Sequence, residues 1–149
     1  MFSEAALTSL RRLKMLKMLQ LDSIPNLTTP LLMDICRGCD KIVDLGLYNM
    51  SGLTNLSFES LGRLVSLHFQ NVPATDATIQ SIATHCSKLE TLSLISLTEI
   101  TDIAIDYLAN GVCQSLKTLD LTGCIRVKTL PQKYNIVSIK TVKKLVVEG

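Results

Sequence analysis

The chain has 149 residues, of which 47% are hydrophobic and 19% are charged, and its formal net charge is +2. These values are typical of one globular domain with a continuous core, and they exclude a disordered chain. The small charge excess argues against a nucleic-acid-binding protein, since no aromatic residues interleave with the Lys and Arg clusters, and no segment is long and apolar enough to span a membrane.

The N-terminal segment favours a helix or cap over residues 1–15. Its Ser and Arg content and its helical apolar spacing also suit a mitochondrial presequence, but Glu4 and the lack of a break before the next segment favour the helix. No uninterrupted apolar stretch of the signal-peptide kind is present, and an odd number of cysteines, five, argues against a secreted disulfide framework. We therefore expect an intracellular protein, cytoplasmic or nuclear.

A Leu-x-x-Leu-x-Leu template recurs along residues 16–149, with six matches whose first positions are separated by 26, 22, 25, 27 and 26 residues. Each match predicts a short strand, because its last two apolar positions face one side of an extended segment while their neighbours face the other. One unit of this length cannot bury its leucines alone, so the units are expected to stack into six parallel strands, in about five and a half repeats. The matches are Leu16-Leu19-Leu21, Ile42-Leu45-Leu47, Leu64-Leu67-Phe69, Leu89-Leu92-Leu94, Leu116-Leu119-Leu121 and Val142-Leu145-Val147.

The segments between the templates predict three short helices. Thr29 and Pro30 have the pattern of an N-cap followed by Pro at the first helical position. Asp76 and Thr101 precede two further segments with apolar residues at helical spacing. The second unit is short and predicts at most a helical turn, and residues 125–140 have no helical pattern.

The segment CSKLETLSLISLTEITDIAIDYLANGVCQSLKTLDLTGC, residues 86–124, carries a resemblance to a known repeat. It resembles the cysteine-containing leucine-rich repeat, whose pattern runs Cys-x-x-Leu-x-x-Leu-x-Leu-x-x-Cys-x-x-Ile-Thr-Asp. Such repeats are similar to those of F-box leucine-rich-repeat proteins and of the antagonist-of-mitotic-exit family. The resemblance implies an α/β fold, a leucine-rich-repeat solenoid with a curved parallel sheet and short helices on the convex side.

Four of the five cysteines occupy repeat positions. Cys39, Cys86 and Cys113 each stand three residues before the first apolar residue of a template, and Cys124 stands three residues after the last one. A free cysteine behaves as a small hydrophobe, so we expect these thiols to fill space between the layers. Cys36 and Cys39 also form a CxxC pair, but neither a second ligand pair nor a thioredoxin-like helix start accompanies it. No metal and no other cofactor is expected.

Residues for catalysis are not evident in the sequence. No Ser or Cys carries a glycine elbow, no Gly-rich loop is suited to phosphate, and the acidic residues are scattered and unpaired. His85 is expected at an exposed helix end, outside any metal site. We therefore expect a protein that is not an enzyme.

The polar positions between the buried leucines predict a binding surface, because stacking aligns them in three columns on the concave side. Tyr48, His68, Gln70, Ile95 and Asp120 are the candidate protein-binding residues, since interface affinity comes from a few large anchors ringed by polar contacts. The alternative is a solvated sheet face whose contacts lie in the loops. The columns are Met18, Asp44, Ser66, Thr91, Thr118 and Lys144; Gln20, Gly46, His68, Ser93, Asp120 and Val146; and Asp22, Tyr48, Gln70, Ile95, Thr122 and Glu148.

The family resemblance implies a protein-protein interaction module. In F-box proteins such repeats hold the substrate of an SCF-type ubiquitin ligase, which would make the chain a ubiquitin ligase adaptor in ubiquitin-dependent proteolysis. An F-box needs more helical sequence than the 15 residues before the first repeat, so we expect a fragment or an F-box-less relative, with SCF components as partners only if an F-box lies upstream. The alternative is a stand-alone scaffold or inhibitor with no ligase link.

Overall fold

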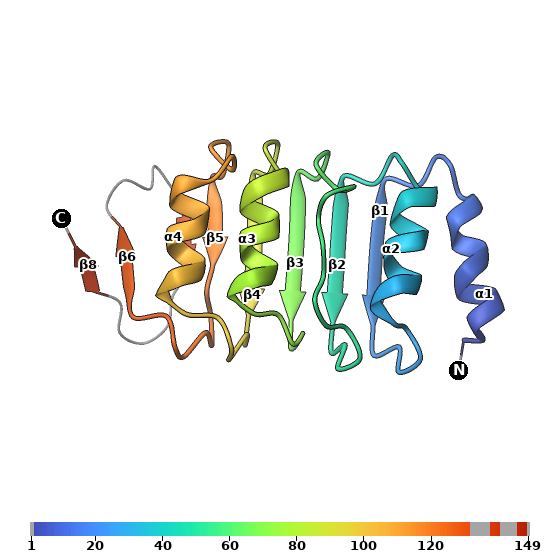
Figure 1. Ribbon diagram of the computed structural model, residues 1–149, viewed down its shortest axis with the longest axis horizontal. Helices are drawn as coiled ribbons and strands as arrows, with labels where there is room; N and C mark the ends of the chain where they lie inside the picture. Colours follow the sequence, from blue (N-terminus) through green and yellow to red (C-terminus); the bar gives the residue numbers. More distant parts are fainter. Residues whose placement is uncertain (1, 132–137, 141–145, 149) are drawn as a thin grey trace.

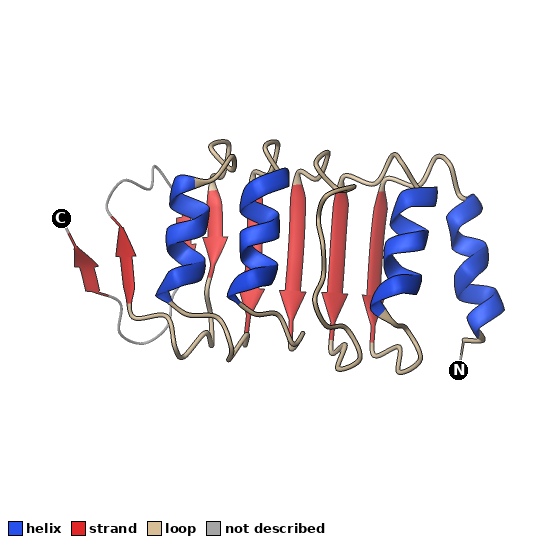
Figure 2. Cartoon of the chain, in the orientation of Figure 1, coloured by secondary structure: helices blue, strands red, loops and turns tan. Residues whose placement is uncertain are grey.

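A parallel β-sheet with helices on one face forms the α/β fold in the computed structural model, which describes residues 2–131, 138–140 and 146–148 (Figures 1 and 2). The main sheet has the strand order β1-β2-β3-β4-β5-β7, and each neighbouring pair is parallel. A separate parallel pair is formed by β6 and β8. The strands are β1 (Met18–Asp22), β2 (Asp44–Tyr48), β3 (Ser66–Gln70), β4 (Thr91–Ile95), β5 (Thr118–Asp120), β6 (Thr129–Pro131), β7 (Ser138–Lys140) and β8 (Val146–Glu148).

The first five predicted strands are confirmed, and their register aligns the template leucines in rows across the sheet. Leu45, Leu67, Leu92 and Leu119 are successive partners in one row, and each is fully buried. Leu19 begins this row at the sheet edge and keeps 7% exposure. The alternation of apolar and polar residues therefore sets both the register and the side of the core.

The sixth predicted strand overlaps β8, but the prediction that it lies beside the fifth strand of the main sheet is wrong. The strand that pairs with β5 is Ser138–Lys140, and the template segment 142–147 lies largely outside the described residues. Val146 and Glu148, assigned to the second and third columns, belong to β8, which pairs with β6. Lys144, assigned to the first column, lies outside the described residues. Ser138-Ile139-Lys140 repeats the polar-apolar-polar alternation of Thr118-Leu119-Asp120, and period-two alternation alone does not decide which of two nearby segments pairs.

The predicted helices are all present. The N-terminal helix is α1 (Glu4–Ser9), continued by the 3-10 helix η1 (Leu10–Arg12). The three helices between strands are α2 (Thr29–Gly38), α3 (Asp76–His85) and α4 (Asp102–Asn110). The N-cap of α2 is Thr28 and not Thr29 as predicted, so Pro30 stands in the first turn. Residues 49–65, between β2 and β3, hold turns and no helix.

Side chains at the starts of the three helices tie each unit to the backbone of the next. Each accepts hydrogen bonds from backbone N–H groups about one repeat further along the chain, so the helical layer is connected as well as the sheet. The bonds are Thr54 N to Thr29 Oγ1 at 2.9 Å, Thr101 N to Asp76 Oδ1 at 2.7 Å, and Lys128 N to Asp102 Oδ1 at 2.6 Å.

The cysteines lie inside the core, as expected, and all five are free and buried. Four of the thiols donate to backbone carbonyl groups of the preceding unit, so each bridges two layers as well as filling space. The bonds are Cys39 Sγ to Leu10 O at 3.1 Å, Cys86 Sγ to Leu61 O at 3.7 Å, Cys113 Sγ to Cys86 O at 3.3 Å, and Cys124 Sγ to Leu94 O at 2.8 Å.

We expect all five thiols to react slowly with a chromogenic disulfide reagent in the native state and together on unfolding. Burial raises the pKa of Cys36 and of Cys86 to about 12, and it raises the pKa of Cys113 and of Cys124 to about 11. The thiolate is the reactive form, and little of it exists at neutral pH with such values. The measurement compares reaction time courses with and without denaturant. A thiol that reacts stoichiometrically and fast in native buffer would show that this part of the core is open.

Candidate protein-binding face

The helix-free face of the main sheet carries the predicted columns. Side chains alternate between the two sides of each strand, and the burial patterns of β3 and β4 follow this alternation residue by residue. The register confirms the first five members of the first and second columns and the first four of the third. Thr122, placed in the third column, lies beyond the end of β5.

The structure brings the five candidate residues onto this face in two neighbouring rows. Tyr48, Gln70 and Ile95 are register partners across β2, β3 and β4. His68 and Asp120 lie in the next row, separated by Ser93 of β4. All five are half-buried, so each keeps surface that a partner could contact.

The side chain of Tyr48 lies along the sheet surface and does not project away from it. A Cβ atom added at Gly46 would lie 2.7 Å from Tyr48 Cε2 and 2.8 Å from its hydroxyl oxygen, which places the ring directly over Gly46. Burial raises the pKa of Tyr48, and the nearby carboxylates of Asp44 and Asp22 raise it further. The glycine in the second column therefore makes room for a flat aromatic surface, an arrangement that spacing alone does not reveal.

Asp44 is a feature of this face that the sequence did not indicate as functional. Its Oδ1 atom is buried and has no hydrogen-bond partner among the described residues. A buried acceptor without a donor is costly, and each such group in a folded protein needs an explanation. Asp44 lies in the first column, on the same strand as Tyr48, but its Oδ1 atom is buried and is not accessible to a donor from outside the chain.

Asp120 and Asp22 are already engaged at the turns that follow their strands. Asp120 Oδ1 accepts from Thr122 N at 3.0 Å and from Thr122 Oγ1 at 2.6 Å. Asp22 Oδ1 accepts from Asn49 Nδ2 at 3.0 Å, and Asn49 Oδ1 accepts in turn from Asn71 Nδ2 at 2.8 Å. The hydrogen bonds from Asn49 and Ser23 lower the pKa of Asp22. This ladder fixes the border of the face next to the third column.

The turns also have a repeated backbone conformation that the sequence analysis missed. The residue after each of the first four strands has a positive φ, with values of 53° at Ser23, 53° at Asn49, 51° at Asn71 and 57° at Ser96. Asn tolerates this left-handed region better than most residues, so Asn49 and Asn71, each directly after a strand, are the signal that could have revealed two of these four turns.

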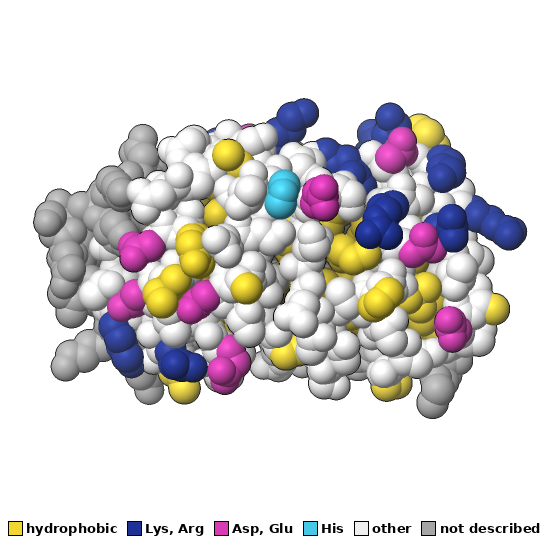
Figure 3. Space-filling view, in the orientation of Figure 1, with side chains coloured by type: hydrophobic (Ala, Val, Ile, Leu, Met, Phe, Trp, Pro, Cys, Tyr) yellow, Lys and Arg dark blue, Asp and Glu magenta, His cyan; other side chains and the backbone are white. Residues whose placement is uncertain are grey.

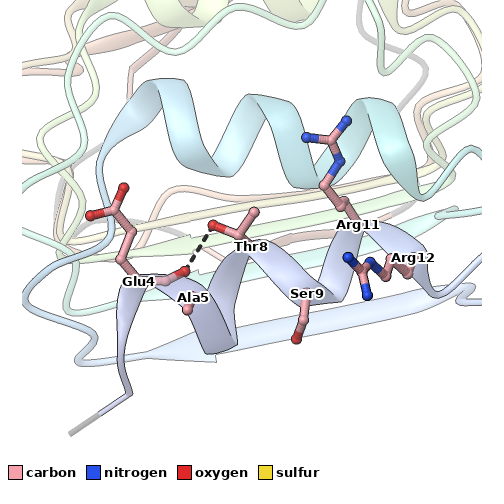
Figure 4. Close-up of a pocket in the computed structure, with 6 residues that line it drawn as sticks. All are labelled: Glu4, Ala5, Thr8, Ser9, Arg11 and Arg12. Atoms are coloured by element: carbon pink, nitrogen blue, oxygen red, sulfur yellow. Dashed lines mark hydrogen bonds between the residues drawn. The ribbon is translucent and has the colours of Figure 1, made fainter.

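A hollow lies outside the sheet, beside α1 and η1, and Figure 4 shows its six lining residues. Thr8 Oγ1 donates to the Glu4 carbonyl at 2.8 Å, and Arg11 extends toward α2, where it pairs with Asp34 at 2.8 Å. Arg12 remains beside η1. Most polar groups here serve the local structure, so we do not regard this hollow as the main site.

Comparison with known proteins gives no relative from which a site could be transferred. No family model matches the sequence, and a search of the curated proteins finds no significant match. Across the described part of the chain, no three His, Cys, Asp or Glu side chains are grouped so as to hold a metal ion. None of the described helices has the length and apolar character needed to cross a membrane.

Proposed function

We propose that the chain is a protein-protein interaction module of the leucine-rich-repeat type, whose helix-free sheet face is the concave side of a curved solenoid. The observation that carries the proposal is the register, which aligns Tyr48, Gln70 and Ile95 in one row. The helices lie on the other face of the sheet, so this row is not covered by them (Figure 1). Strands about 4.8 Å apart place Tyr48 and Ile95 about 10 Å from each other, so one partner segment can contact both.

In its more specific form, the proposal is that this module recognises substrates for an SCF-type ubiquitin ligase. It rests on the resemblance of residues 86–124 to the repeats of F-box leucine-rich-repeat proteins. The second candidate is a stand-alone scaffold or inhibitor without a ligase link, and the half-buried polar face supports both candidates equally. Depleting the protein from cells separates them, since a captured partner accumulates if it is a degradation substrate and keeps its level if it is held on a scaffold.

Replacing Tyr48 and Ile95 together by Ala should weaken binding of a captured cellular partner at least tenfold, which corresponds to about 1.4 kcal/mol. Large side chains dominate interface affinity, and these two are the largest aliphatic and aromatic groups of the row. Affinity pull-down with the wild-type chain identifies the partner. Titration of that purified partner then measures its affinity for the wild type and for the double variant.

Lys88→Ala is the matched control, because Lys88 is exposed in the loop before β4 and belongs to none of the three columns. Circular dichroism checks that both variants keep the fold. Equal affinity of the double variant and the wild type for the captured partner would move the binding site to the loops or to an edge of the sheet.

A further inference from the structure

The N-terminal edge of the main sheet is open. Lys17 O accepts from Asp44 N at 3.1 Å, and Ser23 N donates to Tyr48 O at 3.0 Å. The odd-numbered residues between 17 and 23 therefore direct their backbone N–H and C=O groups toward β2. In a parallel ladder, alternate residues direct theirs to the opposite side. The N–H and C=O groups of Met18 and Gln20 therefore face away from the sheet, as an unpaired template for another strand.

The helical layer extends past this edge. Figure 1 shows α1 beyond β1, with no strand of the sheet behind it. An apolar groove lies between α1 and β1, and Gln20 and Asp22 also line it. Its apolar lining includes Phe2, Leu7, Leu10, Leu19 and Leu21. The space beside β1 and under α1 is thus where the apolar side chains of one more strand would lie.

The apolar residues at this edge remain in contact with solvent. Leu19 and Leu21 keep 7% and 8% exposure, whereas their partners Leu45 and Leu47 on β2 are fully buried. Phe2 is 63% exposed and Met18 is 56% exposed, in a protein whose other large apolar side chains are mostly in the core. The cap that α1 provides is therefore incomplete.

The charge around the edge indicates what kind of segment fits. Figure 3 shows Lys and Arg side chains gathered over the N-terminal end of the molecule. Arg11 is paired with Asp34, and Lys14 Nζ donates to Gly38 O at 2.8 Å. Arg12 and Lys17 are exposed and make no side-chain hydrogen bond or ion pair with any described residue. Two free cations near the start of β1 favour an acidic residue on the incoming segment.

We propose that the β1 edge and the groove under α1 bind an extended segment of a partner protein as an added strand, with apolar residues at alternate positions and an acidic residue beside Lys17. Main-chain pairing supplies affinity in such complexes, and side-chain pockets supply specificity. A second copy of this chain fits less well, because α1 extends past β1, and the α1 helices of two copies would occupy the same space if their β1 edges were paired. This surface goes beyond the proposed sheet-face function and is independent of it.

The test selects binding peptides from a randomised phage-displayed library with the purified chain and measures the enriched peptides by fluorescence anisotropy. Enriched sequences should alternate apolar and polar residues and carry an acidic residue at one end. Gln20→Pro should weaken their binding at least tenfold, since it removes an outward N–H without breaking the β1–β2 ladder, and Pro is tolerated on edge strands. Lys17→Glu should weaken it most at low salt.

Phe2→Asp is the second variant, because it changes an exposed side chain of the groove and leaves the strand intact, and Lys88→Glu is the charge control. The Tyr48/Ile95 double variant should keep peptide binding, which separates this edge from the sheet face. The proposal is overturned if no alternating peptide is enriched, or if Gln20→Pro and Phe2→Asp bind the peptides as well as the wild type. It is overturned also if sedimentation shows a dimer that Gln20→Pro dissociates, since the occupant is then a second copy.

Discussion

Replacing Leu92 by Ala is expected to lower the free energy of unfolding by about 2–5 kcal/mol. Leu92 lies on the central strand β4, between Leu67 of β3 and Leu119 of β5, and all three side chains are fully buried. The parallel ladder fixes the backbone on both sides, so the neighbours cannot close the space that the lost side-chain atoms leave. The penalty therefore combines lost burial with a residual cavity.

Urea unfolding followed by circular dichroism measures this effect. Ser93→Ala is the matched control, because Ser93 is the next residue of the same strand and points to the half-buried face. That substitution should change stability by no more than about 0.5 kcal/mol, as is usual for surface positions. Equal destabilisation by the two substitutions would mean that the apolar rows do not form the core.

The first five strands could be predicted from sequence because each template carries two independent signals. The recurring leucines give the period of the repeat, and the polar residues between them give the side that faces the core. In the sixth unit both signals weaken. Ile139 and Val147 each fit an apolar position, and the choice between them depends on the path of residues 125–140, for which no local pattern is available.

The candidate face could be predicted only as far as the direction of its side chains. Strand alternation assigns Tyr48, Gln70 and Ile95 to the same side and the register places them in one row. The position of the Tyr48 ring over Gly46 depends on a side-chain rotamer, and the burial of the Asp44 oxygen depends on what surrounds it in space. Neither property follows from spacing along the chain.

Arg63 is the clearest case of a stabilising residue that the repeat pattern does not reveal. It lies in residues 49–65, the segment without a helix, just before β3. Its guanidinium donates to Ser60 O at 2.5 Å within its own unit, and to Cys36 O at 3.0 Å and Cys39 O at 2.9 Å in the preceding unit. Cys36 belongs to the last turn of α2, where backbone carbonyl groups lack intrahelical donors. Arg63 thus caps the preceding helix from the next unit.

Replacing Arg63 by Ala should lower the free energy of unfolding by about 1–3 kcal/mol, the usual cost of leaving buried acceptors without a donor. Arg63→Lys should recover only part of this loss, because an ammonium group is a point charge and cannot reproduce the planar fork that reaches three carbonyl groups. Arg126→Ala is the control, since among the described residues the Arg126 side chain interacts only with Glu99, in an exposed pair at 3.4 Å, and such pairs contribute little. Urea unfolding of the three variants beside the wild type gives the comparison. If Arg63→Ala is no more destabilising than Arg126→Ala, water replaces the guanidinium at these carbonyl groups, and the β2–β3 ladder and the leucine rows hold the junction between the second and third units without it.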